Sequence, residues 1–67
     1  MQKKLRKLRS IEEVLRFIKK EDKDSAVTRF MIERLVAKKS IFYTTTGNKI
    51  LVDLDEVLEK LGLIYEN

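Results

Sequence analysis

A hairpin signature between two helical patterns constrains this chain more than any other feature. Two runs rich in β-branched and aromatic residues, 41–45 and 49–52, flank the tripeptide Thr46-Gly47-Asn48. Because glycine and asparagine tolerate the positive φ of tight hairpin turns, these runs should pair as antiparallel strands. One helical pattern precedes the hairpin and another follows it, so the sequence predicts an α+β fold.

The first helix is predicted to follow Ser10 and to run to about Lys19. Ser10-Ile11-Glu12-Glu13 matches the capping box, in which the serine hydroxyl and the second glutamate each accept a hydrogen bond from the other residue's amide. An apolar stripe with helical spacing follows, formed by Ile11, Val14, Leu15 and Ile18. Residues 20–24 are all charged and should form an exposed turn.

A second helix is predicted from a cap at Thr28 to about Lys38, with Asp24 and Ser25 as alternative caps. An advance of about 100° per residue separates an apolar face from a mixed face. The apolar face holds Ile32, Leu35 and Val36. The mixed face holds Phe30, Glu33, Arg34 and Ala37. If the helix is rotated by a modest angle, Phe30 becomes a core residue instead.

The third helix should be capped by Asp53, with Glu56 as its reciprocal partner. Gly62 is placed to end it in the left-handed conformation. The expected organisation is a basic N-terminal arm at residues 1–9 and one domain at residues 10–67. That domain would contain two helices, a β-hairpin and a C-terminal helix.

Composition argues against enzymatic function. The 67 residues include no Cys and no His, which excludes thiolate nucleophiles, imidazole bases and the usual zinc ligand sets. Asp53, Asp55 and Glu56 are better explained by helix capping than by metal binding. No cofactor, metal or membrane span is expected, and a cytoplasmic location fits best.

Charge is distributed unevenly along the chain. Residues 1–9 carry five basic groups and no acid, whereas residues 53–67 carry five acids and one base. This asymmetry is expected when one face of a protein meets a polyanion, although a solvated tail would explain the arm equally well. Double-stranded DNA is the predicted partner.

The mixed face of the second helix supplies the candidates for reading bases. Arg34 leads, because arginine forms paired hydrogen bonds with guanine. Glu33 would accept from cytosine N4 or hold Arg34 in place, and Phe30 would contact a thymine methyl group or stack along the backbone. Predicted phosphate contacts come from Arg29, Lys38 and Lys39. The hairpin tip adds polar candidates for the backbone or minor groove: Thr45, Thr46, Asn48 and Lys49.

Several of these segments together resemble a known family. They are similar to small excisionase-like winged-helix proteins of bacterial mobile elements and prophages. The segments that carry the similarity are Ser10-Ile11-Glu12-Glu13, the helix from Thr28 through Ile32-Glu33-Arg34-Leu35, Ile41-Phe42-Tyr43 and the run from Thr46 to Asp55. The similarity covers about residues 9–62.

The resemblance implies a winged helix-turn-helix, with the second helix in the major groove and the hairpin as the wing. It also implies an architectural partner of a tyrosine-type site-specific recombinase or a small bacterial transcription regulator, with further copies of the chain on DNA as possible neighbours. Arg34 matches the usual arginine of the recognition helix, Phe30 its frequent aromatic residue, and Asn48-Lys49 the end of the wing turn.

The chain departs from the family pattern in ways that reduce positive charge. The position of Glu33 is often basic, a glycine often stands where this chain has Lys39 or Ser40, and a basic residue is usual near Thr45. The basic arm could compensate. The alternative is a protein-interaction module, in which Phe30 and Met31 anchor a partner helix or a second copy.

Overall fold

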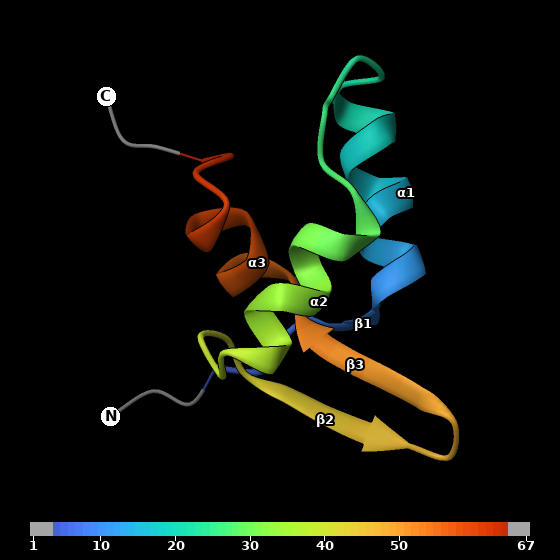
Figure 1. Cartoon of the computed structure of the whole chain (residues 1–67), viewed down its shortest axis with the longest axis vertical. Coiled ribbons are helices and arrows are strands. Elements are labelled where there is room, and N and C mark those ends of the chain that lie inside the picture. Colours follow the sequence, from blue (N-terminus) through green and yellow to red (C-terminus); the bar gives the residue numbers. More distant parts are fainter. Residues whose placement is uncertain (1–3, 65–67) are drawn as a thin grey trace.

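The computed structural model describes residues 4–64 and contains three helices and three strands. In chain order the elements are β1 (Leu8–Ser10), α1 (Ile11–Glu21), α2 (Arg29–Ala37), β2 (Tyr43–Thr46), β3 (Lys49–Asp53) and α3 (Leu54–Lys60). The helices gather around one end of the sheet, and the β2–β3 hairpin projects beyond them (Figure 1). The α+β class is confirmed. None of the described helices is long and apolar enough to cross a membrane.

The sheet has three antiparallel strands in the order β1-β3-β2. The expected hairpin is confirmed, with Thr46 paired to Lys49 around a two-residue turn. Gly47 supplies the positive φ, 58°, at the first central position, as in a type II′ turn. Strand β1 was not expected, since residues 8 and 9 had been assigned to the basic arm. Its Arg9 pairs with Val52, so the folded domain begins earlier than residue 10.

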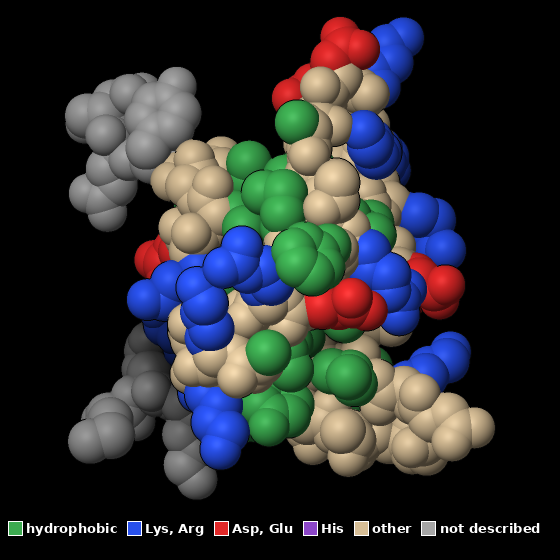
Figure 2. All heavy atoms as spheres, in the orientation of Figure 1, with side chains coloured by type: hydrophobic (Ala, Val, Ile, Leu, Met, Phe, Trp, Pro, Cys, Tyr) green, Lys and Arg blue, Asp and Glu red, His purple; other side chains and the backbone are tan. Residues whose placement is uncertain are grey.

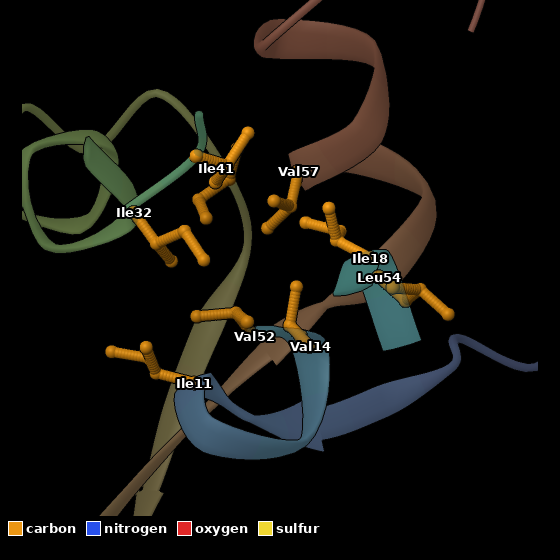
Figure 3. Close-up of a cluster of buried hydrophobic side chains, with 9 residues drawn as sticks. Ile11, Val14, Ile18, Ile32, Ile41, Val52, Leu54 and Val57 are labelled. Atoms are coloured by element: carbon orange, nitrogen blue, oxygen red, sulfur yellow. The ribbon is translucent and has the colours of Figure 1, made fainter. Parts of the chain in front are cut away.

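All three helices and the sheet contribute to one hydrophobic core. Its four fully buried side chains are Val14, Ile32, Val52 and Val57. Figure 3 shows them among the other members of the same buried cluster, Ile11, Ile18, Ile41 and Leu54, and Val27 completes it. Each helix therefore presents one apolar side to the core, which leaves its other side free for binding.

The expected N-caps of α1 and α2 are present. The Ser10 hydroxyl accepts from the Glu13 amide at 3.2 Å, and the Glu13 carboxylate accepts from the Ser10 amide at 3.0 Å. Hydrogen bonds to the Glu13 carboxylate, from the Ser10 amide first and the Ser10 hydroxyl second, lower the pKa of Glu13. At α2, Thr28 is the cap, and its hydroxyl accepts from the Met31 amide at 3.4 Å.

Helices α2 and α3 end in the same way. After α3, the amides of Gly62 and Leu63 donate to carbonyls of the last turn, and Gly62 has φ 71°. After α2, the amides of Lys39 and Ser40 do the same, and Lys39 has φ 55°. Both ends form the Schellman motif, which favours glycine at the left-handed position. Lys39 thus occupies a glycine position, at a cost in backbone strain.

Candidate nucleic-acid interface

One face of α2 is exposed along its whole length. Ile32 is fully buried beneath the helix, whereas Phe30 is 64% exposed on the other side. The rotation expected from the sequence is therefore confirmed, and Phe30 is not a core residue. The exposed ring lines a hollow together with the basic side chains of Arg34 and Lys38, so this face offers a partner both apolar and cationic contacts.

Arg34 lies one turn after Phe30 on the same face. Its guanidinium carbon is 5.8 Å from the centre of the Phe30 ring, near the outer limit of a cation–π contact. No carboxylate among residues 4–64 pairs with Arg34 or with Lys38 one turn further on. These three side chains line a shallow hollow of about 250 Å³ that α3 closes at Leu61. An unpaired arginine beside an exposed ring is suited to contact a base edge or a phosphate.

Arg29 begins the same helix but has acidic neighbours. Its Nε donates to the Glu33 carboxylate at 2.9 Å, and its Nη1 lies 3.8 Å from that of Glu12 on α1. Glu33 therefore holds Arg29 and not Arg34, which corrects one of the two roles expected for it. The reason is geometric, because residues four apart in a helix face each other and adjacent residues do not. The contact of Glu12 with Arg29 could not be predicted from the sequence, because it depends on how α1 and α2 pack.

The hairpin tip comes close to the start of α2. Asn48 and Lys49 line a hollow of about 180 Å³ together with Arg29 and the first turn of α1. Thr45 and Thr46 are exposed on the hairpin but line neither this hollow nor the one beside Arg34. The structure thus brings two groups of candidates to opposite ends of α2, with Arg29 and the tip at its start.

Positive charge gathers at the end of α2. Figure 2 shows Lys and Arg side chains clustered over the second half of this helix, next to an exposed hydrophobic group, with acidic side chains towards its start. Lys39 follows the last turn in its left-handed conformation, exposed to solvent. The charge of the expected interface therefore changes along α2. Acidic side chains lie towards the start of the helix, and the surface is most basic at its end, where Arg34 and Lys38 project.

The described part of the basic arm is tied to the folded domain. Arg6 Nη1 donates to Asp53 at 3.0 Å and to Glu56 at 2.6 Å, and its guanidinium carbon lies 4.2 Å from the centre of the Phe42 ring. These bonds, to Glu56 first and Asp53 second, raise the pKa of Arg6. The Nζ of Lys7 lies 4.0 Å from the Oδ1 of Asp55. Acidic residues of the domain thus neutralise part of the basic arm, which reduces the positive charge that the arm can offer to a polyanion.

Within residues 4–64, no three acidic, His or Cys side chains converge to form a metal site. Comparison with family models, with curated proteins and with solved structures finds no match. Function must therefore be argued from the geometry of α2 and the hairpin.

Proposed function

We propose that this chain is a winged helix-turn-helix protein that binds double-stranded DNA. The observation that carries the proposal is the unpaired Arg34 beside the exposed ring of Phe30 on the outer face of α2. An α-helix with its side chains is about 10–12 Å across, and the major groove, about 12 Å wide, admits it. The order of α1, α2, hairpin and α3 supports the same fold.

In this arrangement α2 lies in the major groove. Arg34 reads a base edge and Phe30 contacts a thymine methyl group, while Lys38 and Lys39 contact phosphates. At the start of the helix, Arg29 is shared between the acids that hold it and the DNA backbone.

The β2–β3 hairpin acts as the wing. Asn48 and Lys49 at its tip lie beside Arg29, so they would reach the backbone or minor groove next to the major groove that α2 occupies. Thr45 and Thr46 add neutral hydroxyl donors along the same edge. With Lys49 as the cation at its tip, the hairpin contributes position more than affinity.

The proposed role follows the resemblance to excisionase-like proteins. The protein would act in the bacterial cytoplasm as an architectural partner of a tyrosine-type recombinase or as a small transcription regulator.

A salt titration tests the proposal. Fluorescence anisotropy with a labelled mixed-sequence duplex would compare the wild type with Arg34→Ala, using Lys23→Ala as the control in the exposed α1–α2 connection. We expect affinity to fall with salt and Arg34→Ala to weaken binding by about 1–3 kcal/mol, whereas Lys38→Ala should reduce the logarithmic salt slope by about 1. Affinity that is independent of salt, or equal in Arg34→Ala and Lys23→Ala, would contradict the proposal.

The second candidate function is a protein-interaction module on the same helix. Phe30 and Met31 are both exposed, 64% and 38%, and line the hollow that Leu61 closes. A partner helix could bury them. Under this alternative a complex should persist at high salt, Phe30→Ala should abolish it, and DNA should leave the amide resonances of α2 unshifted.

A further inference from the structure

A second surface lies around Phe17 on α1, away from the proposed DNA interface. Phe17 is 40% exposed and borders two hollows of opposite character. The surface shares no lining residue with the hollows at either end of α2. Nothing in the proposed DNA binding uses it.

The first hollow, about 480 Å³, is basic. Four cationic side chains surround it, Lys7, Arg9, Arg16 and Lys20. Among residues 4–64, Glu13 is the one carboxylate that lines it, and this carboxylate already accepts from the Ser10 amide. Because the Lys7 Nζ lies 4.0 Å from the Asp55 carboxylate, the positive charge available in this basic hollow comes mainly from Arg9, Arg16 and Lys20.

The second hollow, about 300 Å³, is mainly apolar and has an acidic rim. It lies between the ends of α1 and α3, where Leu63 and Ile64 are 38% and 48% exposed. Glu21 and Asp22 form its rim. Exposed apolar side chains that line one hollow, unlike scattered ones, indicate a surface that a partner covers.

The two hollows flank Phe17 on different sides of α1, the basic one reaching Lys20 and the other Glu21. On a helix of 3.6 residues per turn, Lys20 lies roughly 60° to one side of Phe17 and Glu21 roughly 40° to the other. A two-fold axis parallel to α1 would therefore place Lys20 of one chain opposite Glu21 of another, twice, with the two Phe17 rings meeting at the axis. Such a surface is complementary to itself, as an isologous dimer requires.

We infer that a second copy of this chain packs here, α1 beside α1 in parallel, with Phe17 as the central anchor. The basic hollow of each copy faces the acidic rim of the other. An acidic partner would match the basic hollow but not the acidic rim, and a basic partner would match the acidic rim but not the basic hollow. Only a surface carrying both signs satisfies both at once. Because one aromatic anchor and exposed ion pairs carry the contact, the dimer is weak and salt-sensitive.

Sedimentation from micromolar to millimolar concentration at low salt tests this inference. The wild type should form a dimer that dissociates as salt rises. Phe17→Ala should weaken dimerisation about tenfold, as expected for loss of an anchor. Phe30→Ala, an aromatic truncation on the α2 face, which shares no lining residue with this surface, should leave dimerisation unchanged. Circular dichroism would confirm that both variants fold.

A charge exchange tests the pairing itself. Lys20→Glu and Glu21→Lys should each weaken the dimer, and the double variant, which has the wild-type net charge, should restore it. A monomer at every concentration, equal losses in Phe17→Ala and Phe30→Ala, or no restoration in the double variant would overturn the inference.

Discussion

The Arg6 guanidinium donates a 3.0 Å hydrogen bond to the carboxylate of Asp53, 47 positions away in the sequence. Asp53 is 5% exposed and also caps α3, accepting from the Glu56 amide at 3.1 Å. Glu56 in turn accepts from Arg6 and from the Phe42 amide. The buried Asp53 carboxylate thus joins the arm to the start of α3, and the Glu56 carboxylate joins both to Phe42, the residue before β2.

Asp53→Ala should lower the free energy of unfolding by about 1–2 kcal/mol through loss of the helix cap alone. Urea denaturation would measure the change, with Asp55→Ala as the matched control, because its side chain is 62% exposed. Asp53→Asn keeps a capping side chain and loses only the charged partner of Arg6, so it should lower the free energy of unfolding by less than Asp53→Ala does. Equal stability of the Asp53→Ala and Asp55→Ala variants would contradict the role of this carboxylate.

Lys39→Gly should stabilise the protein by about 1 kcal/mol, since glycine adopts the left-handed conformation without strain. Lys38→Gly is the control, because Lys38 is right-handed at φ −84° and gains nothing from glycine. Conversely, Gly62→Ala should destabilise by a similar amount, through backbone strain alone, because a Cβ there meets no atom within 4 Å. The strain at Lys39 is disproved if Lys39→Gly melts at or below the wild-type temperature.

Stability should fall in acid partly through Glu13. Its folded pKa is below the ordinary value of 4.5, so the capping box contributes fully above that value and is lost as pH falls through the folded pKa. Glu13→Gln cannot titrate, and its unfolding free energy should depend less on pH between about 5 and 3. Urea midpoints measured across this range would decide, and parallel curves for the two proteins would rule out the effect.

Local signals predicted much of this fold. The caps at Ser10, Thr28 and Asp53, the turn at Gly47 and the helix end at Gly62 all depend on residues within a few positions of one another. Such interactions are set by side-chain type and spacing, so a sequence displays them directly.

Features that depend on tertiary contact were missed. Strand β1 has three residues and no alternating pattern, and it forms because β3 offers an open edge. Glu56 was expected to accept from the Asp53 amide, but that amide donates to the Phe42 carbonyl. Glu56 accepts from Phe42 and Arg6 instead. The candidates on α2 were placed correctly as a face, whereas the neutralisation of Arg29 and Arg6 required the packing of distant elements.

Glu33→Gln should tighten DNA binding several-fold at low salt, because it removes a negative charge next to the phosphates and releases Arg29. Glu59→Gln makes the same change of charge on an exposed position of α3 and should have a smaller effect. Anisotropy titrations with one duplex would compare the two. Weaker binding by Glu33→Gln would instead indicate that Glu33 itself accepts from a base.

The most direct test of DNA binding through α2 and the hairpin is an NMR titration of the wild type with a mixed-sequence duplex at low salt. We predict amide shifts concentrated at Phe30 and Arg34 on α2 and at Asn48 in the hairpin turn, and their loss in Arg34→Ala. Unshifted resonances, or shifts confined to the outer faces of α1 and α3, would contradict the account.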